Sequence, residues 1–229
     1  MTGHDDFCPD GSGPQAGVTF DRAGNLYGTT EGGGYRTDIG NGTVYELSPG
    51  SNGWKETVLS PPELPIQKGG KPLGEVSLDS LGNVYSTFSF GGTNAAGGLF
   101  RYNPRNRKFT TFSFNGIDGQ TPSAGVLIDS GSAAIYGTTF VGGANRCGTV
   151  FKMVAPVQET VLYSFGSQPN LADGCGPLAA LIADKSGNLY GTTKIGGANG
   201  QGVVFEITPQ AASTAATPGT LRSLRNTSN

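Results

Sequence analysis

The sequence predicts an all-β protein of the β-propeller type, in which four repeats of about 54 residues each form a four-stranded antiparallel blade. Two observations predict this fold. The pattern Gly-Asn-Leu-Tyr-Gly-Thr-Thr occurs four times with small variations, and its tyrosines are 58, 51 and 54 residues apart. These tyrosines are Tyr27, Tyr85, Tyr136 and Tyr190. The chain also has 39 glycines and 14 prolines with an apolar fraction of 35%, which suits many short strands joined by tight turns.

Each unit is expected to begin with a strand that follows a proline and ends before an aspartate-led turn. These first strands are predicted at residues 14–20, 72–78, 122–128 and 177–183. Three of the four turns have the pattern Asp-x-x-Gly-Asn, in which the Asp side chain accepts backbone N–H groups and the Gly adopts a positive φ. A calcium loop would need oxygen ligands at further alternating positions, and these are missing. The pattern therefore predicts a hairpin.

The other three strands of each unit follow in order. The second strand carries Tyr and Thr, which favour β-structure, and a Gly-Gly pair comes after it in every unit. The third strand begins with Gly and alternates apolar and polar side chains, as on a half-exposed strand. Third strands are expected at residues 42–47, 98–102, 148–153 and 202–207. Fourth strands are expected at residues 54–60, 108–114 and 159–165, with a weaker candidate at 220–224.

The domain organisation follows from this repeat. Residues 1–209 are predicted to form the propeller repeats, and residues 210–229, rich in Ala, Thr and Ser, a low-complexity and mostly disordered tail. Phe7 aligns with Phe114, which ends a blade, so the chain opens inside a repeat. We therefore expect an incomplete propeller, with the remaining repeats and any signal peptide in a longer parent chain. Apolar blade surface around Val18, Phe20 and Tyr27 should then be partly uncovered.

The repeated motif resembles that of the GloVer tandem-repeat family, bacterial proteins with many copies of a Gly-Asn-Leu-Tyr-Gly-Thr-Thr, Gly-Gly, Gly-Thr-Val-Phe unit. The resemblance covers residues 7–209. The second copy departs from the motif at Ser86 and Phe88, and the third has Ala133 and Ala134 in place of Gly-Asn. The resemblance implies a propeller-like fold and an exported or cell-surface location. It implies no catalytic residue.

Charge and composition exclude several functional classes. The net charge is −2 and only 14% of the residues are charged, so the chain lacks the basic stripe that binds nucleic acid. The local cluster of Arg101, Arg105, Arg107 and Lys108 is interpreted as a solvated hairpin. No stretch approaches the roughly 20 apolar residues that span a bilayer, so membrane insertion is not expected.

Residues with the chemistry of a catalytic or metal site are few. The one histidine, His4, lies at the very start, and no His/Cys cluster has metal-ligand spacing, so neither a metal nor a cofactor is predicted. Paired carboxylates among Asp10, Asp118 and Asp173 could in principle support glycoside hydrolysis. They occur once per repeat, however, and this regularity favours a role in turns. No catalytic residue is assigned.

The loops that follow the Gly-Gly pairs differ between copies and are the predicted binding site. In a four-stranded blade, the second-to-third loop and the blade-to-blade loop open on the same face. The candidate ligand-binding residues of this loop face are Tyr35, Arg36, Asp38, Asn94, Asn145, Arg146 and Asn199. Amide, guanidinium and aromatic groups suit hydroxyl-rich ligands such as glycans. Asparagine also serves as a turn residue, and this alternative stays open.

A disulfide is predicted between Cys147 and Cys175, which lie in loops of adjacent blades on that face. Cys8 holds the position equivalent to Cys175, so its partner is expected in a preceding repeat. Taken together, the sequence favours a non-catalytic extracellular repeat module that binds a glycan, another carbohydrate or a surface protein on its loop face. One alternative is a polysaccharide-active hydrolase or lyase on the same scaffold, and another is a structural cell-surface spacer.

Overall fold

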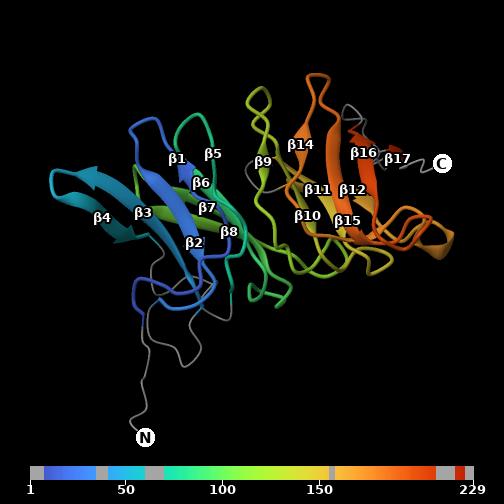
Figure 1. Ribbon diagram of the computed structural model, residues 1–229, viewed down its shortest axis with the longest axis horizontal. Coiled ribbons are helices and arrows are strands. Elements are labelled where there is room, and N and C mark those ends of the chain that lie inside the picture. The colour runs from blue at the N-terminus through green and yellow to red at the C-terminus, as the bar shows by residue number, and fades with distance from the viewer. Residues whose placement is uncertain (1–7, 35–40, 60–69, 155–157, 210–219, 225–229) are drawn as a thin grey trace, which may run out of the picture.

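The computed structural model describes residues 8–34, 41–59, 70–154, 158–209 and 220–224. These residues form four antiparallel sheets, called the first to fourth blades (Figure 1). The first blade contains β1 (Thr19–Phe20), β2 (Leu26–Thr30), β3 (Thr43–Gly50) and β4 (Gly53–Val58). The second contains β5 (Ser77–Leu78), β6 (Val84–Phe88), β7 (Gly98–Asn103) and β8 (Lys108–Ser113). The third contains β9 (Leu127–Ile128), β10 (Ile135–Thr139), β11 (Thr149–Val154) and β12 (Gln158–Ser164). The fourth contains β13 (Cys175–Pro177), β14 (Ile182–Ala183), β15 (Leu189–Ile195), β16 (Val204–Thr208) and β17 (Thr220–Leu224).

The predicted all-β fold with four antiparallel blades is confirmed; among the described residues three blades have four strands, and the fourth has five because both β13 and β14 pair with β15. The described part of the chain holds no α-helix, only the short 3-10 turn η2 (Pro169–Leu171). Residues 220–224, the weak candidate for a fourth strand, pair with β16 as β17. None of the described residues belongs to a helix with the length and apolarity needed to cross a membrane.

The first strand of each blade is shorter than the sequence predicted. In the first blade only Thr19 and Phe20 pair with β2, opposite Tyr27 and Leu26. In the second, third and fourth blades, the residues before the paired segment cross from the outer edge of the preceding blade to the inner edge of their own. Proline at the start of this segment has no N–H to donate, which limits its pairing. In the fourth blade Pro177 ends β13, and pairing with β15 resumes only at Ile182.

The aspartate-led hairpins form as predicted, and each carboxylate is used within its own turn. Asp79 Oδ1 accepts the backbone N–H groups of Leu81 and Asn83, both at 2.9 Å. Its Oδ2 accepts the amide of Asn83 at 2.6 Å and the hydroxyl of Tyr85 at 3.1 Å. Burial alone would raise the pKa of Asp79, but these hydrogen bonds outweigh it and leave the pKa below its ordinary value. Asp21 and Asp184 make the equivalent bonds.

The glycine that follows the repeated tyrosine allows a close approach between neighbouring strands. Gly137 lies opposite Phe151, and a Cβ on Gly137 would come within 2.5 Å of the Phe151 ring. The third-strand aromatic residues lie over Gly28 and Gly191 in the same way. This explains why the repeat needs its smallest residue at this point, since a methyl group would displace a buried ring.

Three apolar clusters join consecutive blades and form the core. One contains Tyr27 and Val44 of the first blade with Phe100 and Tyr102 of the second, and equivalent clusters join the second to the third and the third to the fourth. Each interface also repeats one hydrogen bond from a second-strand threonine to a carbonyl of the next blade. These bonds run from Thr29 to Gly74 (3.1 Å), Thr87 to Ala124 (2.8 Å) and Thr138 to Ala179 (3.2 Å).

The blades follow one another along the longest axis of the molecule, and the first and fourth lie at opposite ends (Figure 1). Val18 and Phe20 on the first blade are exposed, as expected for an uncovered blade face. The expectation for Tyr27 was wrong, because this side chain is buried against the second blade. Successive residues of a strand point to opposite faces, so Tyr27 points away from the face that carries Phe20.

Candidate functional site

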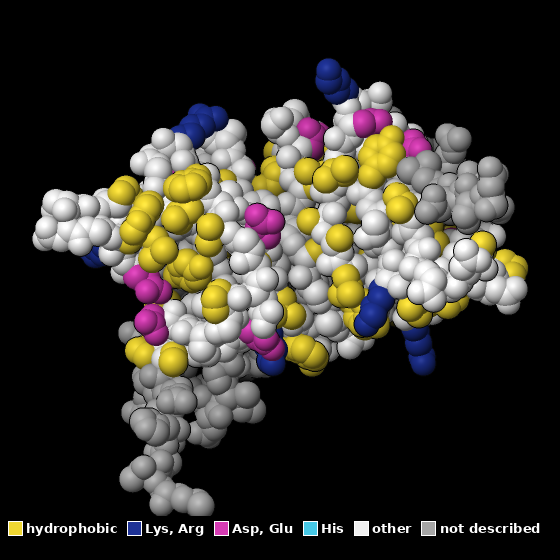
Figure 2. Space-filling model, viewed as in Figure 1, with side chains coloured by type: hydrophobic (Ala, Val, Ile, Leu, Met, Phe, Trp, Pro, Cys, Tyr) yellow, Lys and Arg dark blue, Asp and Glu magenta, His cyan; other side chains and the backbone are white. Residues whose placement is uncertain are grey.

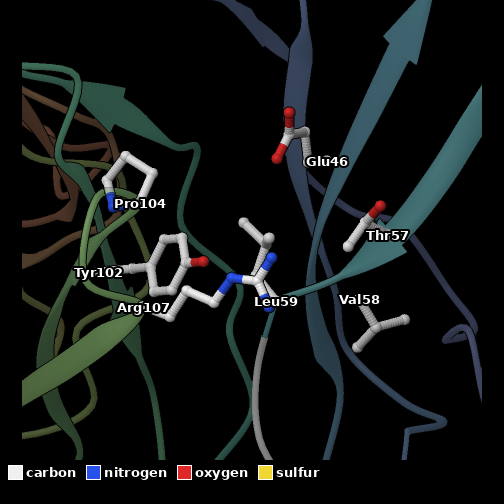
Figure 3. A pocket seen from close by; sticks show the side chains of 7 residues that line it. All are labelled: Glu46, Thr57, Val58, Leu59, Tyr102, Pro104 and Arg107. Atoms are coloured by element: carbon white, nitrogen blue, oxygen red, sulfur yellow. The ribbon is translucent and has the colours of Figure 1, made fainter.

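The structure has a groove of about 430 Å³ between the first and second blades, a volume within the usual range for small-ligand sites (Figure 3). The first blade contributes Glu46 from β3, Thr57 and Val58 from β4, and Leu59 directly after it. The second blade contributes Tyr102 at the end of β7, and Pro104 and Arg107 from the turn before β8.

Strand register explains why these side chains meet. Tyr27 pairs with Glu46 and Glu46 pairs with Thr57, so the three lie in one row across the first blade, on the face that packs against the second. Arg107 completes the β7–β8 turn with a φ of +54°, a left-handed conformation that is uncommon outside glycine. In the first blade the turn residue Gly53 has a φ of +111°. The guanidinium is therefore a feature of the second blade that its neighbour lacks.

The two charged residues of the groove have opposite charges and lie on opposite walls, Glu46 on the first blade and Arg107 on the second. Glu46 Oε1 accepts the hydroxyl of Ser48 at 3.0 Å. Burial raises the pKa of Tyr102, the negative charge of Glu46 adds to this and the positive charge of Arg107 opposes it. Among the described residues no ion pair joins Glu46 to Arg107. A neutral phenol, a carboxylate and a guanidinium thus face a common space beside apolar Leu59, whereas the Val58 side chain points away from Tyr102 and Arg107 (Figure 3).

The loop face has the topology that the sequence predicted. Asn94 and Asn145 are exposed, and each donates its side-chain amide to the backbone where the chain leaves its blade, at Phe114 O (3.1 Å) and Phe165 O (3.2 Å). The residue after each asparagine is left-handed, with a φ of +55° at Ala95 and +59° at Arg146. These asparagines therefore hold the loop to the crossover, and their carbonyl oxygens are the part that remains to meet a ligand.

The remaining candidates of the loop face are less informative. Arg146 and Asn199 are exposed at the tips of their loops. Tyr35, Arg36 and Asp38 lie outside the described residues. The structure therefore brings Asn145 and Arg146 together in one turn and places Asn94 and Asn199 in the equivalent turns of the neighbouring blades.

The predicted disulfide between Cys147 and Cys175 is confirmed, with a Cα–Cα distance of 4.6 Å. It joins the loop before β11 to β13 and so ties the third blade to the fourth. The backbone N–H of Gly176 donates to Cys147 O at 2.8 Å and strengthens the same link. Cys8 is a free thiol within the described chain.

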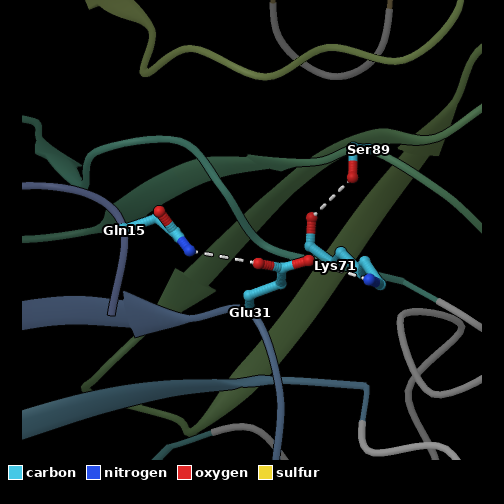
Figure 4. A network of polar contacts seen from close by, with 4 residues as sticks. All are labelled: Gln15, Glu31, Lys71 and Ser89. Carbon is cyan, nitrogen blue, oxygen red and sulfur yellow. Dashed lines mark hydrogen bonds and ion pairs between the residues drawn. The ribbon is translucent and has the colours of Figure 1, made fainter. Parts of the chain in front are cut away.

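A polar network ties the first blade to the second beside the ends of β2 and β6 (Figure 4). Lys71 Nζ forms an ion pair with Glu31 Oε1 at 2.8 Å, and Gln15 donates to the other oxygen of Glu31 at 3.2 Å. The Lys71 ammonium holds the pKa of Glu31 below its ordinary value. Ser89 donates its hydroxyl to the carbonyl of Lys71 at 3.1 Å. All of these groups satisfy one another, so the network serves to fix the two blades.

A pair of carboxyl groups lies between the second and third blades. Burial raises the pKa of Glu159 to about 8, and its neighbour Asp118 adds to the rise by charge and by a side-chain hydrogen bond. Glu159 Oε1 is buried without a hydrogen-bond donor. Glu56 holds the equivalent place in the first blade, where burial and then the charge of Asp10 raise its pKa. The recurrence of the pair in two blades favours a structural role.

Asp173, the third carboxylate considered from the sequence, is buried and accepts hydrogen bonds from Tyr163 and from the backbone and hydroxyl of Ser167. It serves the turn before β13, as the sequence interpretation favoured. Within the described ranges, no group of three or more His, Cys, Asp or Glu residues could hold a metal ion.

The sequence interpretation of the basic cluster as a solvated hairpin agrees with the exposed Arg105, Arg107 and Lys108 at the β7–β8 turn, but it did not reveal the groove. Arg107 is exposed and also lines the groove, and Arg101 lies over the Tyr85 ring at 6.0 Å. One signal was present in the sequence. The charged residue of the third strand changes sign between copies, from Glu46 to Arg101, which marks the interfaces as chemically different.

Comparison with known proteins supports the repeat and the fold. The model of a family described as the Gloeobacter/Verrucomicrobia repeat matches residues 57–227. A search of curated protein sequences found no significant match. Among solved structures, the chain is similar to virginiamycin B lyase from Staphylococcus aureus, with 14% identity and a TM-score of 0.58, over 94% of this chain and 56% of that one. It is also similar to a putative gluconolactonase, with 15% identity and a TM-score of 0.52, over 93% of this chain and 64% of that one.

At these identities the structural similarity establishes the propeller-like fold alone, and the chain spans less than two thirds of each neighbour's length. The family match rests on different evidence, the repeat sequence itself, and it extends over most of the chain. The protein belongs to the Gloeobacter/Verrucomicrobia repeat family.

Proposed function

We propose that this protein is a non-catalytic binding module that takes an acidic, hydroxyl-rich carbohydrate in the groove between its first and second blades. The observation that carries this proposal is the placement of Glu46 and Arg107 on opposite walls of a groove of about 430 Å³, with no ion pair between them. Charged groups that do not satisfy each other are free to recognise a ligand that carries complementary groups.

The chemistry of each wall suggests the class of ligand. A guanidinium binds a carboxylate through two parallel hydrogen bonds, so Arg107 suits the carboxylate of a uronic acid. Glu46 can accept hydrogen bonds from two neighbouring sugar hydroxyls, and Thr57 and Tyr102 can each donate or accept one. Leu59 offers an apolar surface to the C–H groups of a sugar ring.

An extracellular or cell-surface location accompanies this proposal. The disulfide between Cys147 and Cys175 supports it, because disulfides persist in oxidising compartments. The loop face with Arg146 and the three asparagines is a second place where the same ligand, or a surface protein, could bind. The free carbonyl oxygens of Asn94 and Asn145 support it less strongly than the groove, since their amide groups already serve the fold.

A polysaccharide-active hydrolase or lyase is the second candidate function. One observation favours it. Glu159, whose pKa is raised to about 8, lies close to Asp118. Two neighbouring carboxyl groups, one of them an acid with a raised pKa, are the combination that glycoside hydrolysis uses. The equivalent pair in the first blade argues for the structural interpretation instead. Release of reducing ends or of unsaturated uronate from a galacturonic acid polymer, abolished in E159Q, would establish the enzyme.

The binding proposal can be tested by titration calorimetry with a galacturonic acid oligomer and its methyl ester. We expect the acid to bind and the ester to bind more weakly, because the ester cannot pair with Arg107. Loss of a charge-assisted hydrogen bond costs about 1.5–3 kcal/mol, so Arg107→Ala should weaken binding roughly 10- to 100-fold. Arg105→Ala, an exposed arginine of the same turn that does not line the groove, is the matched control and should change the affinity little.

Equal affinities of the wild type and Arg107→Ala would contradict the groove as the site. If binding were then lost in Asn145→Ala, the loop face would be the site. A protein that binds neither this oligomer nor any member of a glycan array would contradict the carbohydrate proposal as a whole.

A further inference from the structure

The fourth blade ends the row of blades with an unpartnered face. In the first three blades, the face that carries the repeated tyrosine packs against the next blade. Val44, Leu99 and Val150 lie on these faces at equivalent register positions and are 0%, 4% and 0% exposed. Val204 holds the same position in the fourth blade and is 48% exposed. Ile182 of β14 pairs with Tyr190, so it lies on this face, and it is exposed too.

The first blade has the complementary unpartnered face. Val76, Val126 and Leu181 each lie four residues after the proline that opens a repeat, and they are 2%, 4% and 3% exposed because the preceding blade covers them. Val18 holds this position in the first blade and is 47% exposed. Figure 2 shows hydrophobic side chains gathered over the first blade, in the region of β1 to β3.

The two faces therefore correspond to the two halves of the interface that the molecule already forms three times. The hydrogen-bonding groups of that interface are present as well. Thr29, Thr87 and Thr138 each donate to a carbonyl two residues after the opening proline of the next blade. Thr192 is the equivalent donor on the fourth blade and is exposed. The equivalent acceptor on the first blade is the carbonyl of Ala16, two residues after Pro14.

We propose that the fourth blade of one copy of this chain docks on the first blade of a second copy, head to tail. The second copy fits because its first blade presents Val18 and Phe20, at the positions where Val76 and Leu78 fill the internal interface, and the Ala16 carbonyl for Thr192. The contact continues an interface geometry that the fold uses throughout. A head-to-tail contact of this kind is heterologous, so it either closes into a ring or extends into a chain of copies.

Sedimentation velocity of the wild type and two variants tests this. The wild type should associate in a concentration-dependent way, whereas Val18→Asp and Val204→Asp should each remain monomeric. Both side chains are exposed in the single chain, so the variants should keep the far-UV circular dichroism of the wild type. Ile117→Asp is the control, because Ile117 is 80% exposed in the crossover between the second and third blades, away from both faces, and it should associate like the wild type.

Mixing the two variants gives the sharper result. Val18→Asp keeps an intact fourth-blade face and Val204→Asp keeps an intact first-blade face, so an equimolar mixture should form a heterodimer of one copy each and nothing larger. A wild type that stays monomeric at about 100 µM would overturn the proposal, and these faces would then belong to further repeats or to another partner. Association of Val204→Asp on its own, or a mixture that stays monomeric, would overturn it as well.

Discussion

The burial of the repeated tyrosine between blades can be measured by comparing Tyr85→Ala with Tyr190→Ala. Both hydroxyls donate to the aspartate of their own hairpin, Tyr85 to Asp79 at 3.1 Å and Tyr190 to Asp184 at 3.0 Å. The two residues differ in what covers the ring. Tyr85 is 8% exposed and packs in the cluster between the second and third blades, whereas Tyr190 is only partly buried on the free face of the fourth.

The expected magnitudes follow from this difference. A tyrosine buried in a core removes about 150–200 Å² from water, which at about 25 cal/mol per Å² corresponds to about 4–5 kcal/mol. Truncation of buried aromatic residues costs about 3–5 kcal/mol, in agreement. Tyr85→Ala should therefore lower the free energy of unfolding by about 4 kcal/mol. Tyr190→Ala should lower it by about 1–2 kcal/mol, mainly through the lost hydrogen bond and the local contacts.

Urea unfolding followed by far-UV circular dichroism gives both values, at a protein concentration where the chain is monomeric. Tyr85→Phe and Tyr190→Phe are the controls. Each removes only the hydroxyl, so both should cost about 1 kcal/mol and differ little from each other. A loss in Tyr190→Ala as large as that in Tyr85→Ala would refute the assignment of Tyr190 to an uncovered face.

Three further predictions concern the packing of the blades. Because the pKa of Glu159 is about 8 in the folded protein, above its ordinary 4.5, the folded state keeps a proton that the unfolded chain releases, and stability should fall as the pH rises from about 5 to 8. The difference between these two pKa values corresponds to about 5 kcal/mol of stability, which solvent screening of the partly exposed carboxyl reduces to about 2 kcal/mol. Urea titrations at several pH values should therefore show a flatter dependence of stability on pH in E159Q. Removal of the disulfide by replacing Cys147 and Cys175 with Ala should cost about 3.5 kcal/mol for a loop of 28 residues, and a loss below about 1 kcal/mol would contradict its role as a link between blades. Gly137→Ala should cost about 2–3 kcal/mol because its methyl group meets a buried ring at 2.5 Å, whereas Gly131→Ala, in an open hairpin with ordinary contacts, should be close to neutral in thermal unfolding.

The fold could be predicted from the sequence because the chain consists of repeats. Alternating residues around Tyr85 and Tyr136 identify the strands, and the spacing of the copies identifies the blades, because each copy must bury its apolar face against the next. The disulfide followed from the same topology, since Cys147 and Cys175 had to lie on one face of adjacent blades. The strands, the blades and the disulfide all depend on the period of the repeat, which can be measured directly in the sequence.

The groove could not be predicted in this way. It depends on which side chains meet across two blades, and on the left-handed turn that contributes Arg107 to one wall. Neither periodicity nor residue type fixes such contacts, because Arg107 has the same neighbours in sequence whether it is solvated or faces a groove. For the loop asparagines, the residue type suggested a ligand site that the structure supports less strongly. Asn94 and Asn145 have the chemistry of ligand contacts, but the fold itself uses their amide groups.

The most direct test of the binding function is to map the contact surface by NMR. Amide chemical shifts of the labelled protein would be recorded during titration with a galacturonic acid oligomer. We predict that the largest changes occur around Glu46, at residues 57–59 and at residues 102–107, which line the groove from both blades. Changes confined to the loops of Asn94, Asn145 and Asn199, with the groove unaffected, would contradict this site, and an unchanged spectrum would contradict binding of this ligand class.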